Sequence, residues 1–280
     1  MEIQVYVASA FSKEGKGGNK AGVVFMDYLL TTAQKMAIAK QLGYAETAFI
    51  STSQKADYKI EYFTPKEEVN LCGHATIGAF VILNYLNKLN KQHYTIETKS
   101  GVLDILHQDD LLFMAQNKPQ FYEILTAAEF STCFNTDIID TQYPIQIVST
   151  GLKDILIPIK SEQQLHHLQP HFNEIKAISE QYSVIGTHLY TCQDDRIICR
   201  NFAPLYEINE EAATGTSNGA LACYLYEKHH MDKPLYVFEQ GYALASPSEI
   251  IVKLETEMNK VEHVYVGGRG YYCETKDITV

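Results

Sequence analysis

The sequence has 280 residues, of which 46% are hydrophobic and 20% charged, and its formal net charge is -11 at pH 7. The length predicts roughly two domains of ordinary size, and the composition excludes a disordered or low-complexity chain. The acidic charge argues against nucleic acid or an anionic membrane as the main partner, although a local site can still bind a small anion.

Three features predict a soluble cytoplasmic protein. The first residues, MEIQVYVASAF, lack the basic stretch that opens a signal peptide. All apolar runs are shorter than the roughly 18 residues that a membrane-spanning helix needs. The six cysteines are scattered without a Cys-x-x-Cys pair, which is typical of reduced intracellular thiols rather than of a disulfide framework.

Strand-like and helix-like segments alternate along the chain. In chain order we expect strands at 3–8 and 21–26, a helix at 31–43, strands at 47–51 and 58–63, an apolar helix at 73–86, a meander at 93–117 with turns at Ser100-Gly101 and Asp109-Asp110, and a second apolar helix at 215–228. Thr31 or Thr32 is the expected cap of the first helix, and Gly43 is its expected stop.

Two segments half a chain apart resemble each other. Residues 62–86 and 201–228 each contain Phe-x-Pro, a polar stretch, a small-residue turn, a Gly-Ala pair and an apolar helix. This repeat predicts two pseudosymmetric lobes, residues 1–125 and 126–280, with the last strands able to pair back onto the first lobe. A cleft between lobes is a favoured ligand site. The alternative is a chance similarity of two strand–turn–helix units.

The starts of the two apolar helices are candidates for anion binding. Glycine, threonine and serine there leave backbone N–H donors accessible and offer hydroxyl caps. The positive end of each helix dipole also favours an anion. Two such ends facing one cleft would bind a carboxylate and stabilise charge on its α-carbon. The alternative is that both are ordinary capped helices.

Three side chains near the first helix start could carry proton chemistry. His74 could donate to a ligand or shuttle a proton, or it could be structural. Cys72 could be an activated thiol, but with His74 it is a poor zinc candidate because no second ligand pair follows. Glu46, beside Tyr44 and Phe49, could be a desolvated general base or a surface turn residue.

Seven motifs in order resemble the PhzF-like proteins of phenazine biosynthesis. They are GGNKAGVV, YAETAF, YFTP…EVNLCGHAT, VSTGL, RNFAP…NEEAATGTSNGALACYL, EQGYALASPSEI and VYVGGRG. The resemblance extends from the first strand to about residue 270. It implies an α+β fold of the diaminopimelate epimerase type, with two pseudosymmetric lobes, each a mostly antiparallel sheet wrapped round a central helix, and the active site between them.

The resemblance also implies an activity and a set of site residues. The family's characterised isomerase moves a proton on a dihydro-hydroxyanthranilate with a glutamate as acid–base catalyst, without a metal or an organic cofactor. By motif match, that glutamate is Glu46. The other matched positions are His74 and Glu211 for catalysis, and Gly73, Ser149, Gly215 and Thr216 for substrate binding. A homodimer and a small anionic, carboxylate-bearing substrate are further family expectations.

The chain departs from the family pattern at several matched positions. Glu211 stands in place of an aspartate, Ala212 in place of a proline and Thr216 in place of a serine. Ala45 removes a hydroxyl from the substrate site, and Lys20 replaces a proline. We therefore expect that the proton-transfer residues are retained and that the substrate differs.

Three functions are compatible with these residues. The leading one is a cofactor-independent isomerase in which Glu46 moves a proton on a small carboxylate-bearing substrate. The second is an amino-acid racemase or epimerase, which needs two opposed acid–base groups. The related epimerases use two cysteines, but Thr214 stands at the second position, so only Glu46 and Cys72 could form a pair; otherwise Cys72 is a buried small residue. The third is a non-catalytic binding or interaction protein.

Overall fold

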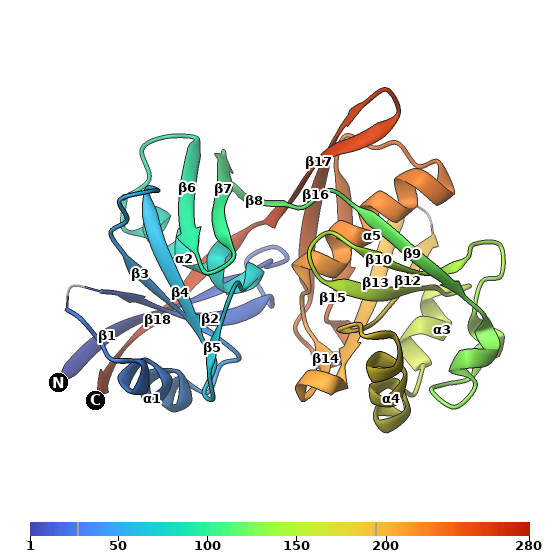
Figure 1. The fold of residues 1–280 in the computed structure, drawn as a ribbon, viewed down its shortest axis with the longest axis horizontal. Coiled ribbons are helices and arrows are strands. Elements are labelled where there is room, and N and C mark those ends of the chain that lie inside the picture. Colours follow the sequence, from blue (N-terminus) through green and yellow to red (C-terminus); the bar gives the residue numbers. More distant parts are fainter. Residues whose placement is uncertain (27, 194) are drawn as a thin grey trace. The chain divides into compact units, whose positions relative to one another are not determined.

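The computed structural model describes residues 1–26, 28–193 and 195–280, which form two compact units. The first unit combines residues 1–115 with residues 267–280, and the second contains residues 116–266. Both are built mainly of strands, with few helices (Figure 1). Among the described residues, no helix is both long enough and apolar enough to cross a membrane.

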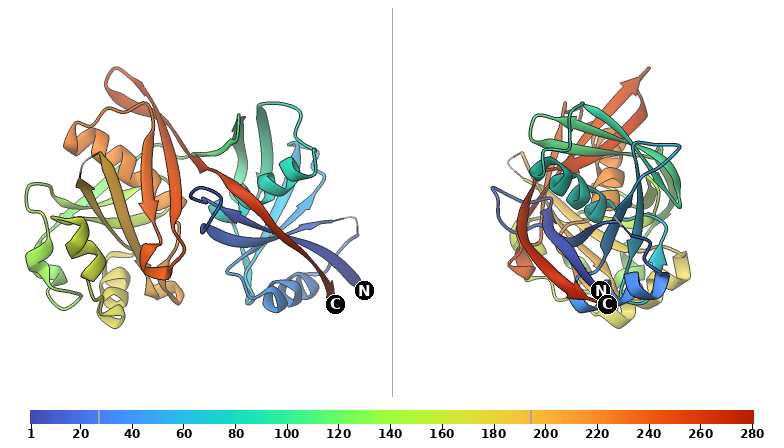
Figure 2. Two further views of the ribbon diagram at one scale, coloured as in Figure 1. Left: turned by 180° about the vertical axis from the view of Figure 1, so that it is seen from behind. Right: turned by 90° about the vertical axis from the view of Figure 1, so that its left-hand side faces the viewer.

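The first unit is a sheet with two helices. Its elements are β1 (Glu2–Ala10), β2 (Asn19–Phe25), α1 (Thr32–Leu42), β3 (Thr47–Ser51), β4 (Tyr58–Phe63), β5 (Glu68–Val69), α2 (Gly73–Tyr85), β6 (His93–Thr98), β7 (Gly101–Gln108), β8 (Leu111–Gln116) and β18 (Gly270–Thr279). The pairings run in the order β18, β1, β2, β3, β4, β6, β7 and β8. Figure 2 shows β18 beside β1, with both chain ends at the same end of this unit.

Helix α2 is the core of the first unit. Every residue from His74 to Leu83 is buried, and the helix packs against β1, β2, β3 and β18. A helix that is apolar on all sides must be covered on all sides, so the sheet wraps round it. The predicted strands, both helices and the meander of this region are confirmed, within one or two residues at their ends.

The second unit repeats this plan with more helices. Its elements are β9 (Gln120–Leu125), η1 (Ala127–Phe130), η2 (Thr136–Ile138), β10 (Ile145–Ser149), β11 (Lys153–Pro158), α3 (Glu162–His167), α4 (Phe172–Tyr182), β12 (Gly186–Gln193), β13 (Arg196–Ala203), η3 (Pro204–Tyr206), β14 (Ile208–Glu211), α5 (Gly215–His229), β15 (Tyr236–Gln240), η4 (Tyr242–Leu244), β16 (Ser248–Glu257) and β17 (Lys260–Gly268). The pairings run in the order β9, β10, β11, β12, β13, β15 and β16.

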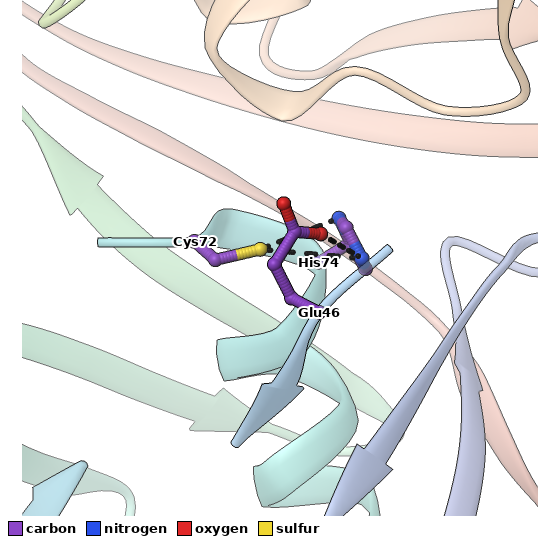
Figure 3. A group of neighbouring side chains, drawn as sticks. All are labelled: Glu46, Cys72 and His74. Carbon is purple, nitrogen blue, oxygen red and sulfur yellow. Dashed lines mark hydrogen bonds and ion pairs between the residues drawn. The ribbon is translucent and has the colours of Figure 1, made fainter. Parts of the chain in front are cut away.

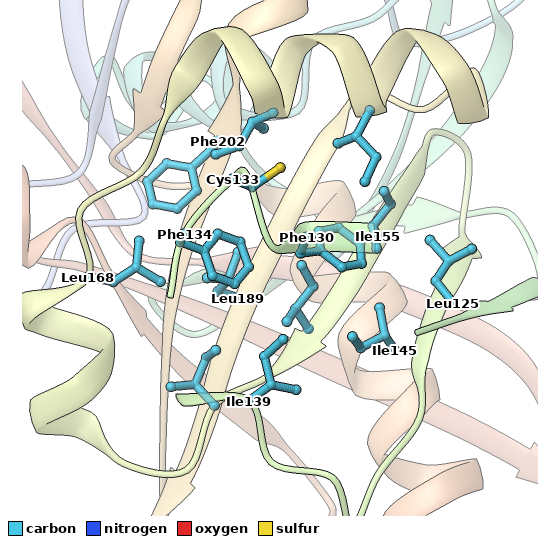
Figure 4. Packing of buried hydrophobic residues seen from close by; sticks show 14 of the residues in the cluster. Leu125, Phe130, Cys133, Phe134, Ile139, Ile145, Ile155, Leu168, Leu189 and Phe202 are labelled. Atoms are coloured by element: carbon cyan, nitrogen blue, oxygen red, sulfur yellow. The ribbon is translucent and has the colours of Figure 1, made fainter. Parts of the chain in front are cut away.

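Two layers cover the sheet of the second unit. Helix α5, buried from Ser217 to Leu225, packs against β10, β11 and β16. A separate apolar cluster joins α3, α4 and η1 to strands β10 to β13, with Phe130, Ile155, Leu189 and Phe202 among its members (Figure 4). Leu189 of β12 belongs to this cluster, whereas its neighbour His188 contacts Asn218 of α5, so the sheet lies between α5 and the cluster.

The repeat in the sequence is also a repeat in the structure. Strand β4 pairs with the short β5 before α2 begins, and β13 pairs with the short β14 before α5 begins. The unit boundaries follow the pairings of the outer strands. Residues 120–125 pair with β10 of the second unit, and residues 270–279 pair with β1 of the first unit. The predicted first lobe was residues 1–125 with the last strands able to pair back onto it, and the first unit contains residues 1–115 and 267–280.

Candidate active site

Glu46 is placed by the end of α1 and the start of β3. Thr31 caps α1 with its side chain, and the helix ends at Gly43, which has the left-handed φ of 72° that glycine adopts without strain. Glu46 follows within the turn, directly before β3 begins at Thr47. The pairing of β3 with β2 and β4 fixes this turn, so only 17% of the Glu46 side chain is exposed.

His74 and Cys72 are placed by the first turn of α2. Cys72 is the cap residue, and its carbonyl accepts hydrogen bonds from the Thr76 N–H at 3.0 Å and from the Thr76 hydroxyl at 2.7 Å. The Thr76 hydroxyl in turn lies 2.6 Å from the hydroxyl of fully buried Tyr62 on β4. This chain ties the helix start to the sheet and holds His74, whose side chain is 7% exposed, over the turn that carries Glu46.

The thiol of Cys72 and the carboxylate of Glu46 both lie close to the His74 ring and close to each other (Figure 3). Nε2 of His74 is 3.2 Å from Oε2 of Glu46. Sγ of Cys72 is 3.5 Å from Nδ1 and 4.0 Å from Nε2. The structure thus brings together Glu46, which the sequence places 28 positions before His74, and the Cys72–His74 pair at the helix start.

Burial controls the charge of this group. Desolvation lowers the pKa of His74, and the Glu46 carboxylate opposes that shift in part. The ring is therefore neutral at pH 7 and carries one N–H. That N–H can lie on Nδ1, toward the thiol sulfur, or on Nε2, which leaves Nδ1 to accept from the thiol; a carboxylate can only accept.

One oxygen of Glu46 lacks a hydrogen-bond donor. Oε2 is buried and accepts no hydrogen bond from the described residues, because the contact with His74, although 3.2 Å long, lacks the alignment of a hydrogen bond. A buried carboxylate oxygen without a donor is costly and uncommon in folded proteins. This atom is therefore ready to accept a proton or a hydrogen bond from a ligand.

The same three side chains have the spacing of metal ligands. One donor atom from each of Glu46, Cys72 and His74 lies within 4.8 Å of the other two. The thiol, however, lies nearer Nδ1 and the carboxylate faces Nε2, whereas a single ion binds one nitrogen of a ring. The expectation of no metal remains a prediction. The arrangement fits proton transfer through the His74 ring, between the Cys72 thiol at Nδ1 and the Glu46 carboxylate at Nε2, better than one shared ion.

The other predicted site residues gather at the start of α5 in the second unit. The Thr214 hydroxyl donates to Oε2 of Glu211 at 2.8 Å. The Thr150 hydroxyl donates to the carbonyl of Thr216 at 3.3 Å, which joins the end of β10 to the first turn of α5. Ser149, at that strand end, accepts the Gly151 N–H at 3.0 Å. Gly215 is the first residue of the helix.

The expectation of hydroxyl caps at the two apolar helices is wrong. Neither Cys72 nor Thr214, the two cap residues, accepts a side-chain hydrogen bond from its helix. The Thr214 hydroxyl instead donates to Glu211 and accepts from Gln240. The first N–H groups of both helices therefore keep their capacity to bind an anion.

Sequence reasoning missed a buried polar group behind α5. Gln240, fully buried at the end of β15, contacts Thr214, Asn218 and the Glu211 carbonyl. Its position within the motif EQGYALASPSEI was the available signal, since Gly241 follows with a φ of 83° and a Cβ there would lie 2.2 Å from the Ser246 carbonyl. Glycine is the residue that adopts such a turn without strain.

Comparison with known proteins shows the family of the chain. The chain matches the family described as phenazine biosynthesis-like protein, PhzC-PhzF, over residues 8–276. An uncharacterized isomerase of Clostridium acetobutylicum is 32% identical across 95% of this chain and 93% of that protein. A second uncharacterized isomerase, YddE of Escherichia coli K12, is 31% identical across 96% and 95%.

Solved structures show the fold. A PhzF-family phenazine biosynthesis protein of Bacillus anthracis superposes with a TM-score of 0.92 over 100% of both chains, at 24% identity. The predicted α+β class, with pseudosymmetric lobes of the epimerase type, is confirmed by this similarity. The chain belongs to the phenazine biosynthesis-like family and is an enzyme of the isomerase class.

Proposed function

We propose that this enzyme moves a proton on a small carboxylate-bearing substrate, without a metal or an organic cofactor, and that Glu46 is the base. The observation that carries the proposal is the buried Glu46 Oε2, which has no hydrogen-bond donor among the described residues. A base in a partly desolvated site abstracts a proton more readily than one fully solvated by water. The proton taken by Oε2 can be returned by the same oxygen at another atom of the substrate.

His74 is proposed to assist this transfer. Its neutral ring, 3.2 Å from Oε2, can donate an N–H to a developing negative charge on the substrate or relay the proton. A charged imidazolium so close would stabilise the Glu46 carboxylate and weaken it as a base. The lowered pKa of His74 therefore supports the proposed role of Glu46.

An anionic group of the substrate is proposed to bind at a helix start. The first turns of α2 and α5 have no side-chain cap, so their N–H groups remain donors for a carboxylate. Glu211, held by Thr214, is proposed to orient the substrate or relay a proton. Ser149 and Thr216 are proposed to complete the binding set. A homodimer, implied by the family resemblance, is likewise proposed and is tested by sedimentation velocity.

A racemase that pairs Glu46 with Cys72 fits the geometry less well. Two groups that act on opposite faces of one carbon must each approach it to about 3 Å, so they stand about 6 Å apart. The carboxylate oxygen and the thiol lie within 4.8 Å of each other and contact the same imidazole ring. They are side by side rather than opposed.

The test is deuterium wash-in from heavy water. The protein is incubated with a panel of cyclic amino acids and dihydroaromatic acids, and deuterium at carbon is read by mass spectrometry. Exchange by the wild type that falls about 10³-fold in Glu46→Gln supports Glu46 as the base. Glu67→Gln, a change at an exposed glutamate of the same unit, is the matched control and leaves exchange unchanged.

Two results would overturn the proposal. Exchange that survives in Glu46→Gln and is abolished in Cys72→Ser would transfer the chemistry to the thiol. Ligand-induced stabilisation of the protein by a compound of the panel, with no exchange into that compound under any condition, would favour a binding protein that retains the fold.

A further inference from the structure

The side chain of Gln240 makes four hydrogen bonds, all to the segment that begins α5. Its Oε1 accepts from the Thr214 N–H at 3.3 Å and from Nδ2 of Asn218 at 3.0 Å. Its Nε2 donates to the Glu211 carbonyl at 2.8 Å and to the Thr214 hydroxyl at 3.0 Å. The side chain is fully buried, so these bonds account for its whole hydrogen-bonding capacity.

The orientation of this amide is fixed by its backbone partners. A backbone N–H can only donate, so the Gln240 atom that faces Thr214 N must be the oxygen. A backbone carbonyl can only accept, so the atom that faces the Glu211 carbonyl must be the nitrogen. Because that nitrogen also faces the Thr214 hydroxyl, the hydroxyl accepts from Gln240 and its own proton points to Glu211 Oε2, 2.8 Å away.

The hydrogen bonds that lead to Gln240 also have a fixed direction, and they begin at His188. Nδ2 of Asn218 donates to the Thr214 carbonyl at 2.8 Å, so its Oδ1 is the atom that faces Nε2 of His188 at 3.2 Å. Burial lowers the pKa of His188 to about 4, so its ring is neutral at pH 7. Its single N–H therefore lies on Nε2, where an acceptor faces it.

We propose that Gln240 is a positioning residue that aims the Thr214 hydroxyl at the Glu211 carboxylate. It is the central member of a one-way chain of donors that runs from His188 through Asn218, Gln240 and Thr214 to Glu211. The chain holds one carboxylate oxygen of Glu211 by a donor that cannot reverse. The catalytic meaning of this arrangement rests on the proposed function of Glu211, but the arrangement itself does not.

The role of Gln240 can be tested without a substrate. A carboxylate that loses a hydrogen-bond donor holds its proton more tightly, so its titration midpoint rises. Loss of Gln240 should raise the midpoint of Glu211 although Gln240 does not touch that carboxylate, because a released Thr214 hydroxyl can turn toward another acceptor. A merely structural role for Gln240 would change stability without moving this midpoint.

The experiment is a carbon-13 NMR titration of the Glu211 side-chain carboxyl, assigned by its loss in Glu211→Gln. Thr214→Val and Gln240→Met should each raise the midpoint by about half a pH unit. The double variant should shift no further than Thr214→Val alone, because both changes remove the same hydrogen bond. Thr214→Ser retains the hydroxyl and should titrate like the wild type.

Gln146→Met is the matched control. Gln146 is also buried in the second unit, but it donates to the Tyr122 carbonyl instead of the start of α5. It should leave the Glu211 midpoint unchanged. If Gln240→Met does not fold, Gln240→Leu replaces it: an apolar side chain can neither donate to Thr214 nor add a charge near Glu211, and the same rise is expected.

The outcomes separate the two proposals. A Glu211 midpoint that moves in Thr214→Val but stays at the wild-type value in both Gln240 variants would overturn the role of Gln240, as would additive shifts in the double variant. If the shifts appear as expected but Glu211→Gln retains full deuterium exchange, the donor chain stands and the proposed role of Glu211 in the reaction fails.

Discussion

Helices α2 and α5 both follow a short strand pair, but the polar side chains at their first turns differ. Before α2, the cap residue is Cys72 and its neighbours are titratable: an imidazole and a carboxylate with one buried oxygen that lacks a donor. Before α5, the cap residue is Thr214, and a buried amide fixes the direction of its hydroxyl proton. The two starts therefore differ in how completely the protein satisfies its own polar atoms.

The difference fits two proposed roles, proton acceptance at α2 and substrate orientation at α5. A group that must accept a proton needs an unused lone pair, and the protein leaves one at Glu46. A group that must orient a ligand needs a fixed direction, and the amide of Gln240 supplies it at Glu211. Under the proposed function, these two tasks account for the Glu46 oxygen without a donor and for the fixed hydroxyl at Glu211.

The largest expected effect compares the two carboxylates. Glu46→Gln should reduce deuterium exchange about 10³-fold, the loss typical of a general base. Glu211→Gln should reduce it only about tenfold, the value of one charge-assisted hydrogen bond. Both are measured as initial rates at saturating substrate, with the fold checked by circular dichroism. Equal losses would remove the distinction between a base at α2 and an orienting group at α5.

The next effect concerns the acid buried beneath α5. Burial raises the pKa of Asp154 to about 7, while Ser217 donates to its Oδ2 at 2.7 Å. The folded state thus favours the protonated acid, so this stabilisation is complete below pH 3.8 and is lost as pH rises toward 7. The stability of Asp154→Asn relative to wild type should increase by about 4 kcal/mol between pH 4 and pH 8.

Urea unfolding across this pH range measures that difference. Exposed Asp137→Asn, in the same unit, is the control, because water solvates its carboxylate in both states. A stability difference for Asp154→Asn that stays constant from pH 4 to pH 8 would show that the buried carboxylate has another source of charge compensation.

A smaller effect tests the anchor of α2. The Thr76 hydroxyl donates to the Cys72 carbonyl, so the Tyr62 hydroxyl must be the donor in the Tyr62–Thr76 contact. Thr76→Val should destabilise the protein by about 2 kcal/mol because it leaves a buried phenol without an acceptor. Adding Tyr62→Phe removes the unpaired hydroxyl and should recover part of the lost free energy of unfolding, as measured by chemical denaturation. Strictly additive losses would mean that the two hydroxyls act independently.

The smallest effect is a shift in titration. His74 should titrate below pH 6.5, because burial lowers its pKa. Glu46→Gln should lower the pKa of His74 further, since the carboxylate is the group that opposes the shift. Nitrogen-15 NMR of the imidazole measures both values. A rise in Glu46→Gln would show that Glu46 is not ionised when His74 titrates.

The local sequence determined the helices and strands and the residues that lie next to each other at each helix start. Thr31 and Gly43 mark the ends of α1, Cys72 and His74 are two residues apart at a helix start, and the Phe-x-Pro repeat predicts two similar strand–helix units, because caps, turns and apolar periodicity act over a few residues. The motif match then pointed to Glu46 and Glu211.

Only the tertiary structure decided which polar atoms meet. Glu46 reaches His74 because β3 pairs with β2 and β4 around α2, and Gln240 reaches Thr214 because β15 runs parallel to β13. The sequence does not show whether the hydroxyl of a cap threonine bonds to its own helix or to a carboxylate. The hydroxyl cap expected at α5 was wrong for this reason. Hydrogen-bond direction depends on every donor and acceptor around an atom, and those neighbours come from distant parts of the chain.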